Sequence, residues 1–236
     1  MRFVIASRDR SSSSSSSADC AFNLHRQLPA GRVTLVSAWI PNTQLPVSSR
    51  NNTLAVSIAG AAADLVEIAV GSYTPTTLAA ALKTALDAAT EGVFTVTVSG
   101  ATNRLTFGCA TAFAFLGDQT GNRVVGLDPY GDSASVTAYE APFAPQLAGQ
   151  SRYSVEIEGA EDGGPTSLVG NHEGSFTVPA TTGYGNVIFH TDDGRICQTV
   201  RLQQSIRQLR VRILDEAGRT ALLEGADWSI VVDSSQ

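Results

Sequence analysis

The residues whose types and spacing come nearest to a catalytic group are a histidine followed closely by two aspartates. His190 precedes Asp192 and Asp193 at the end of an apolar run, and an imidazole beside two carboxylates could hold a metal or transfer protons. The same residues are typical of a tight turn, because aspartates bond local amides and Gly194 accepts a positive φ. We favour the turn, so a hydrolase built on His190, Asp192 and Asp193 ranks third among the hypotheses for function.

The other residues of catalytic or metal-binding type are too scattered to form a recognisable site. Neither HExxH nor CxxC spacing occurs among the histidines and cysteines, which are His25, His172 and His190, and Cys20, Cys109 and Cys197. The chain has no GxSxG, P-loop or GxGxxG motif, and its acidic loop at 156–162 lacks the alternating carboxylates of a calcium loop. The sequence therefore predicts no catalytic residue, no metal and no cofactor, with the cysteines as buried thiols.

Three arginines near the carboxyl end, Arg207, Arg210 and Arg212, share one alternating strand. Such a row could bind phosphate or nucleic acid. The chain carries 16 basic and 22 acidic residues, a net charge of -6, which argues against a general electrostatic grip on nucleic acid. We expect these arginines either to protect a strand edge from aggregation or to pair with acidic neighbours at an interface.

The N-terminal segment is unusual because seven consecutive serines, at 11–17, follow directly on Arg-Asp-Arg. The tract has no apolar side chain to bury, and ordering it costs about 1–2 kcal/mol per residue of backbone entropy. A flexible tail is one interpretation. We predict instead an extended arm over residues 1–18 that neighbouring subunits hold. Its interface candidates are Arg8, Asp9, Arg10, Ser11, Ser14 and Ser17.

Four aromatic residues fall in predicted loops and offer an alternative function. They are Tyr130, Tyr139, Phe143 and Tyr184. Aromatic rings in loops could stack on a sugar, so a receptor- or glycan-binding spike or fibre domain is the second hypothesis.

One helix is expected among the elements that must position these residues. Thr74 suits an N-cap and Pro75 the first helical position, and Leu78, Leu82 and Leu86 then repeat at four-residue spacing. These signals predict one short helix over about 74–89, with its leucine stripe laid on a sheet.

The rest of the chain reads as short strands and turns. Apolar or alternating segments lie at 33–40, 53–58, 65–70, 93–98, 104–107, 153–157, 187–189, 206–213 and 228–232. Because strands and helices do not alternate, the prediction is an all-β, jelly-roll-like β-sandwich with long end loops. We expect one domain over 19–236, with a loop-rich seam near 130–149 as the one plausible division.

No segment reaches the roughly 18 consecutive apolar residues of a membrane span, and the apolar run at the N-terminus is too short for a secretory signal. We therefore expect no membrane span and synthesis in the cytosol. Charged residues make up only 16% of the chain, below the roughly 25% usual for soluble domains. This deficit predicts that neighbours cover part of the surface.

Several segments, in this order, resemble the jelly-roll minor capsid and penton-type proteins of large eukaryotic double-stranded DNA viruses and their virophage-like relatives. The matching pieces are the Arg-Asp-Arg and serine tract leading to 21–24; 33–42; 51–53; 71–74; 94–96; 102–107; 125–127; 209–215; and 225–229. The segment 44–50 departs from the family pattern, which leaves the choice between penton and other minor capsid roles open.

The resemblance implies a structural virion protein without enzymatic activity. Its partners would be the major capsid protein and other minor capsid proteins. It would form a homo-oligomer, with a pentamer as one form, and would be made in the host cytoplasm and located in the virion capsid. Assembly would use strand edges, loops and the N-terminal arm.

Overall fold

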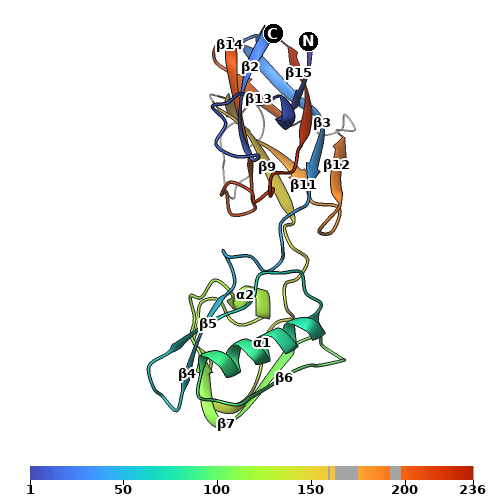
Figure 1. Ribbon diagram of the computed structural model, residues 1–236. Helices are drawn as coiled ribbons and strands as arrows, with labels where there is room; N and C mark the ends of the chain where they lie inside the picture. Colours follow the sequence, from blue (N-terminus) through green and yellow to red (C-terminus); the bar gives the residue numbers. More distant parts are fainter. Residues whose placement is uncertain (159, 163–174, 192–197, 236) are drawn as a thin grey trace. The chain divides into compact units, whose positions relative to one another are not determined.

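The computed structural model describes residues 1–158, 160–162, 175–191 and 198–235 (Figure 1). The chain divides into two compact units. We call residues 1–44 and 150–236 the sandwich, and residues 45–149 the insert, because the insert interrupts the sandwich between two of its strands.

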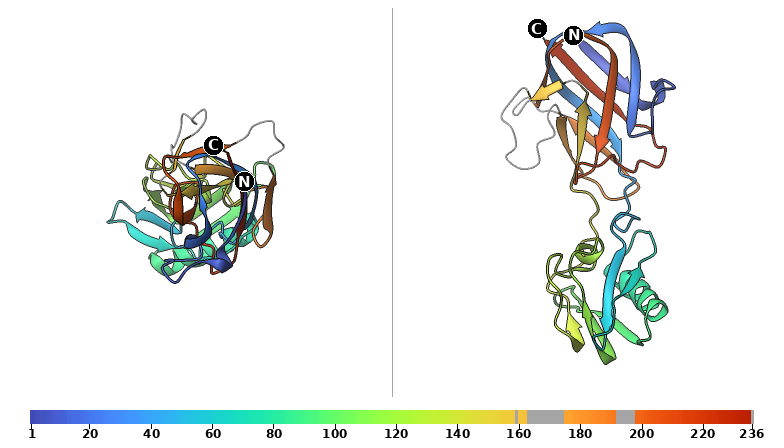
Figure 2. Two further views of the ribbon diagram at one scale, coloured as in Figure 1. Left: turned by 90° about the horizontal axis from the view of Figure 1, so that it is seen from above. Right: turned by 90° about the vertical axis from the view of Figure 1, so that its left-hand side faces the viewer.

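The sandwich contains two antiparallel sheets. The first sheet has the order β1 (Arg2–Ala6), β15 (Ser229–Ser235), β3 (Gly31–Pro41), β13 (Thr199–Leu202) and β10 (Ala160–Asp162), with β12 (Val187–Thr191) also paired to β3. The second sheet has the order β11 (Ser175–Pro179), β9 (Arg152–Ile157), β14 (Ile206–Leu214) and β2 (Asp19–Leu28). Figure 2 shows these strands from two further directions.

Alternation along the strands builds one core between the two sheets. In β9, Tyr153, Val155 and Ile157 are buried, and they belong to the same cluster as residues of β3 and β15. The phenol of Tyr153 donates a hydrogen bond of 3.0 Å to the buried Asn42 side chain, and burial raises the pKa of this phenol. The inner faces of both sheets are therefore covered by one another, as in a β-sandwich.

The insert has one antiparallel sheet. Its order is β5 (Asp64–Glu67), β4 (Thr53–Ile58), β7 (Leu105–Phe115) and β6 (Phe94–Val98), with β8 (Val136–Glu140) also paired to β7. The hairpins expected from 53–58 with 65–70, and from 93–98 with 104–107, are present as the β4–β5 and β6–β7 pairs.

Helix α1 (Pro75–Ala89) covers the apolar side of this sheet. Thr74 caps it: the Thr74 hydroxyl accepts from the Thr77 amide, and the Thr77 hydroxyl accepts from the Thr74 amide. The predicted leucines 78, 82 and 86 are all buried against the sheet. A short α2 (Asn122–Val125) and a single 3-10 turn, Ser7–Asp9, complete the helical elements of the described residues. The predicted all-β sandwich with one short helix is confirmed.

The domain organisation differs from the expectation of one domain over 19–236. The helix and its sheet bury a separate apolar cluster, so residues 45–149 form a compact unit of their own. The second crossing point, between Gly149 and Gln150, lies at the end of the predicted seam at 130–149. The first crossing, between Gln44 and Leu45, lies between Pro41 and Pro46, which indicate only a short turn after a strand, so the pattern did not predict a domain boundary there.

The extended arm over residues 1–18 also needs correction. Residues 2–6 form the edge strand β1, which pairs antiparallel with β15 from Arg2–Asp233 to Ala6–Ser229. Ile5 is buried in the sandwich core. Phe3 and Ile5 thus supply the burial that the serines lack, and the start of the chain is an integral part of the first sheet.

Across the described ranges, no helix is long and apolar enough to cross a membrane.

Candidate assembly surfaces

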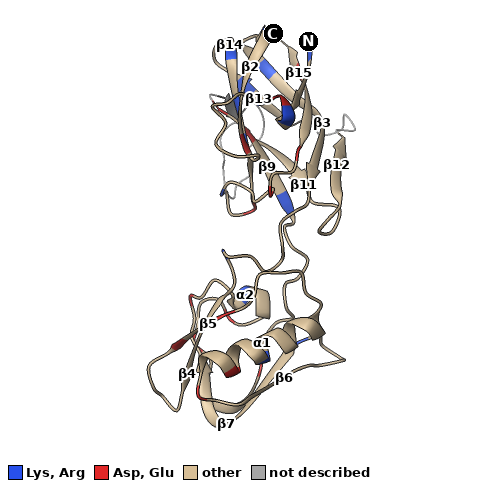
Figure 3. Cartoon of the chain, viewed as in Figure 1, with Lys and Arg blue, Asp and Glu red and all other residues tan. Residues whose placement is uncertain are grey.

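The arginines of β14 pair with carboxylates of the same sandwich. Arg210 donates two hydrogen bonds of 2.7 Å to the two oxygens of Asp19 on β2, and Arg212 donates one of 2.6 Å to Glu156 on β9. The Arg210 guanidinium lowers the pKa of the largely buried Asp19 carboxyl. Figure 3 shows the basic residues on β14. The expected pairing with acidic neighbours is present, but inside one chain.

Arg207 differs from the other two arginines. It is exposed and lies at an irregularity where the ladder between β14 and β2 jumps from the Ile206–Leu28 pair to the Gln208–Asn23 pair. The four residues 24–27 of β2 therefore stand opposite Arg207 alone, and β2 bulges there.

The serine tract folds back on the start of β2. The amide of Ser11 donates to the carbonyl of Ala21 at 2.7 Å, and the hydroxyl of Ser14 accepts from the Ala21 amide at 3.0 Å. The carbonyl of Ser17 accepts from the indole nitrogen of Trp228 at 2.6 Å. Hydroxyls and backbone groups thus replace apolar burial as the means of ordering this tract.

Of the remaining N-terminal candidates, Arg8 and Asp9 are exposed in the 3-10 turn. Arg10 donates to the Ser7 carbonyl at 3.0 Å and lies 3.5 Å from a carboxylate oxygen of Asp227. A polar hollow of about 450 Å³ lies between Arg10, serines 14–17 and residues 221–225. The side chains of these N-terminal candidates can therefore contact a partner, although hydrogen bonds within the same chain fix their backbone.

The outward side of the first sheet carries an apolar surface that the sequence analysis did not predict. Trp39 on β3 pairs in register with Phe189 on β12, and the two ring centroids lie 5.0 Å apart. Trp39 is 42% exposed, Phe189 50% and Val187 55%. On β1, Val4 is 71% exposed and pairs with Val231 of β15. We call Val4, Trp39, Val187 and Phe189 the outer apolar face.

The signal for this face was present in the alternation of β3. Ala38 and Ile40 point into the core, so Trp39 between them must point out. Because most residues of 33–40 are apolar, the run is typical of a strand buried on both faces, and this hides the alternation.

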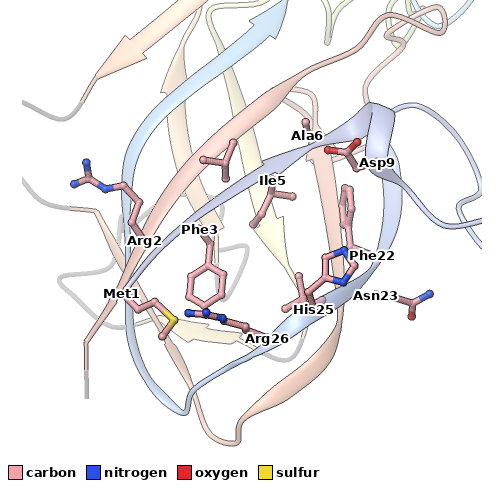
Figure 4. Close-up of a pocket in the computed structure, with 12 residues that line it drawn as sticks. Met1, Arg2, Phe3, Ile5, Ala6, Asp9, Phe22, Asn23, His25 and Arg26 are labelled. Carbon is pink, nitrogen blue, oxygen red and sulfur yellow. The ribbon is translucent and has the colours of Figure 1, made fainter.

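A groove runs along the edges of the two sheets, between β1 and the bulged part of β2 (Figure 4). Its volume is about 510 Å³. Figure 4 shows Phe3, Phe22, His25 and Arg26 gathered in it. Because β1 and β2 each end their sheet, the groove borders two strand edges, where an extended segment of another chain could pair.

The predicted loop aromatics lie in different places. Tyr130 and Phe143 line one hollow in the insert, while Tyr139 packs against Phe115 of the insert core. Tyr184 is exposed in the sandwich, on the turn before β12.

The histidine and cysteine groups bring no site together in the described ranges. His190 lies on β12 opposite Ala38, whereas Asp192, Asp193, Gly194, His172 and Cys197 lie outside the described residues. No group of three or more histidine, cysteine or acidic residues that could hold a metal occurs among residues the structure describes. Cys20 is buried, which raises the pKa of its thiol to about 11, and Cys109 is partly buried.

Comparison with known proteins finds a similar arrangement among the solved structures. No family model and no curated protein matches the sequence. Among solved structures, the crystal structure of the selenomethionine-labelled mavirus penton protein matches with a TM-score of 0.51 and 8% sequence identity. The match covers 98% of this chain and 97% of the penton chain. The chain shares its fold with a viral penton protein.

The resemblance to penton-type capsid proteins is thereby confirmed at the level of the fold. Since the match covers nearly all of both chains, it includes the insert as well as the sandwich.

Proposed function

We propose that this chain is a structural component of a viral capsid and acts as a penton or another minor capsid protein in the virion. The observation that carries the proposal is the match to the mavirus penton protein over 98% of the chain. At 8% sequence identity the match supports the fold alone. Support for a role in assembly must therefore come from the surfaces of this chain.

The outer apolar face is the first of these surfaces. An exposed tryptophan and an exposed phenylalanine side by side on a sheet are costly to leave in water, and such patches mark interaction sites. Aromatic residues are enriched in the centres of protein interfaces, where charged residues are depleted. This face therefore contacts a neighbouring capsid chain, either a second copy or the major capsid protein.

The groove between β1 and β2 is the second surface. The exposed Arg26 and His25 line it together with the half-buried Phe3, so it offers both an apolar wall and hydrogen-bond donors. Strand edges and terminal segments are common points of contact in symmetric assemblies. A partner strand laid on β1 or β2 would extend one of the sheets.

A capsid protein works by surface complementarity and needs no reaction. The sandwich would provide the rigid block, and its surfaces the contacts with other copies of this chain, the major capsid protein and other minor capsid proteins. The homo-oligomer, with a pentamer as one form, belongs to this proposal, as does assembly in the virion after synthesis in the host cytoplasm.

The decisive experiment is purification of virus particles from the source of this sequence, followed by mass spectrometry. We expect the chain in the particles at a sub-stoichiometric ratio to the major capsid protein. Its absence from intact particles would overturn the proposal.

A second experiment tests the outer apolar face. The double variant Trp39→Ser and Phe189→Ser should lose incorporation into particles while keeping the melting temperature of the free chain within a few degrees, because neither side chain is part of the buried core. Leu65→Ser, which changes an exposed leucine of the insert, is the matched control. Equal incorporation of both variants would show that this face makes no essential contact.

A further inference from the structure

A small hollow in the insert combines aromatic and polar walls. It has a volume of about 270 Å³ and lies beside the C-terminal end of α2. The buried Gly126 and Leu127 line it, together with Tyr130 and Phe143, which are 77% and 55% exposed. Ligand sites for drug-sized molecules start at about 300 Å³, so this hollow suits a single ring rather than a peptide.

The two sides of the hollow are held in place by the backbone. The Phe143 amide donates to the Gly126 carbonyl at 3.0 Å, and the Gln146 amide donates to the Val124 carbonyl at 3.0 Å. Gly126 has a φ of +80°, and a Cβ there would lie 2.2 Å from the Phe143 carbonyl oxygen. Only glycine allows this close approach, so the hollow is formed before any ligand arrives.

The Tyr130 ring carries hydrogen-bonding groups at its rim. Arg123 donates a hydrogen bond of 2.7 Å to the Tyr130 hydroxyl, and its guanidinium carbon lies 5.7 Å from the ring centroid. The Asp128 carboxylate accepts from the Tyr130 amide at 2.9 Å. An aromatic face, a guanidinium donor and a carboxylate acceptor therefore border one small space.

These groups match the two sides of a sugar ring. A pyranose presents an apolar face of C–H groups, which stack on aromatic rings, and an edge of hydroxyls, which both donate and accept. Arg123 can donate to such a hydroxyl, and Asp128 can accept from one. We propose that this hollow of the insert binds a neutral sugar residue, such as the terminal hexose of a glycan.

Charge distinguishes this ligand from the other ring-shaped candidates. The insert carries four basic and eight acidic residues, and Asp128 stands at the rim of the hollow. Arg123 and Asp128 balance one another at the rim, so the net negative charge of the insert as a whole disfavours a phosphate or a sugar carboxylate relative to a neutral hydroxyl. Nucleotides and acidic sugars are therefore disfavoured.

The sugar site goes beyond the capsid role. A capsid component can assemble without it, and a sugar-binding insert can exist without assembly, so the two proposals fail in different experiments. Exposed aromatic residues that meet at a preformed hollow distinguish this part of the insert from its other exposed apolar residues, such as Val93.

The test is saturation-transfer NMR on the full chain with free glucose, galactose, mannose, N-acetylglucosamine and sialic acid, each at millimolar concentration. We expect transfer to at least one neutral sugar and none to sialic acid. Tyr130→Ala and Phe143→Ala should each weaken binding about tenfold, because each removes one stacking wall. Tyr130→Phe keeps the ring and loses the hydroxyl that Arg123 contacts, so it should weaken binding only about two- to threefold.

Tyr184→Ala is the matched control, because Tyr184 is an exposed aromatic residue of the sandwich and should leave binding unchanged. Should Phe143→Ala fail to fold, the largely exposed Tyr130 decides. Absence of transfer from every neutral sugar, binding that survives Tyr130→Ala, or a preference for sialic acid would each overturn the proposal.

Discussion

The sandwich and the insert stabilise their sheets in different ways. In the sandwich two sheets cover one another, and contacts join residues far apart in sequence: Arg210 binds Asp19 from 191 positions away. In the insert a helix covers one sheet, and the Lys83–Asp87 ion pair joins neighbouring turns of that helix. The stability of the sandwich therefore depends on contacts of both chain ends, whereas much of the insert is stabilised by contacts between residues close together in sequence.

This difference fits a division of labour. A block closed by its own termini can present rigid faces such as the outer apolar face to neighbours, which suits assembly. An inserted unit with its own core can carry a binding hollow without disturbing that block. Variants of each unit test this difference.

The largest effect is expected from Phe107→Ala in the insert. Phe107 is fully buried, and its ring centroid lies 4.7 Å from that of Phe115, so the truncation should cost the insert about 3–5 kcal/mol. Both tryptophans, Trp39 and Trp228, belong to the sandwich. Thermal unfolding should therefore show an early transition by far-UV circular dichroism, while the tryptophan-fluorescence midpoint stays nearly unchanged.

The matched variant is Phe176→Ala, which truncates a fully buried phenylalanine of the sandwich. It should lower the fluorescence midpoint instead. A single transition that moves equally in both probes for both variants would show that the two units unfold together. The sandwich and the insert would then not be stabilised separately.

The next effect concerns the N-terminal segment of the sandwich. The fully buried Ser7 hydroxyl donates to Asp227 at 2.8 Å and accepts from the Trp228 amide at 2.9 Å. Ser7→Ala leaves that buried amide without this partner, so it should cost about 1–3 kcal/mol. The fluorescence midpoint should fall, with the exposed Ser12→Ala as an unchanged control. An unchanged midpoint for Ser7→Ala would mean that the first residues behave as a loose arm.

A pH series sharpens the role of the Arg210–Asp19 pair. The pKa of Asp19 is lowered in the folded chain, chiefly by its hydrogen bonds from Arg210, so the unfolded state binds the proton more tightly. The contribution of the pair is present above the unfolded pKa of about 3.9 and is lost as the pH falls through the lower folded value. Asp19→Asn should cost about 1–2 kcal/mol at pH 7 and less at pH 3.

Urea midpoints of the fluorescence transition between pH 7 and pH 3 measure this difference. The urea midpoint of Asp19→Asn should change less with pH than that of the wild type. Some pH dependence should remain, because Arg2 also lowers the pKa of Asp233. Asp64→Asn, an exposed position of the insert, should leave the pH dependence of the wild type unchanged. Parallel curves for the wild type and Asp19→Asn would show that the pair is too solvated to matter.

The sequence predicted best those features whose causes are local. Helix α1 was placed within a residue or so because Thr74, Pro75 and the leucine stripe lie next to one another along the chain. The hairpins of the insert followed from alternation around short turns. The β-sandwich class followed from the number of strands and the lack of alternation with helices.

Features with distant causes were missed. The pairing of β1 with β15 joins residues more than 220 positions apart, and no local pattern marks it. The serine tract is ordered by hydrogen bonds to residues such as Ala21 and Trp228, which composition does not reveal. Similarly, four loop aromatics were equivalent in the sequence, and only the fold shows that Tyr130 and Phe143 border one hollow.

The smallest expected effect lies in the insert, at the cap of α1. Thr74→Ala removes the hydroxyl that accepts from the Thr77 amide at 3.2 Å, and an N-cap of this kind contributes about 1 kcal/mol. Thr76→Ala changes an exposed threonine two residues further along, in the first turn of α1. It keeps the cap and serves as the control. Circular dichroism should show a small loss confined to the insert transition for Thr74→Ala alone. Thr74→Ala should leave the fluorescence midpoint of the sandwich unchanged, whereas Ser7→Ala should lower it and leave the transition of the insert unchanged. That result would show that a contact between neighbouring residues stabilises the insert, and that a contact between residues far apart in sequence stabilises the sandwich.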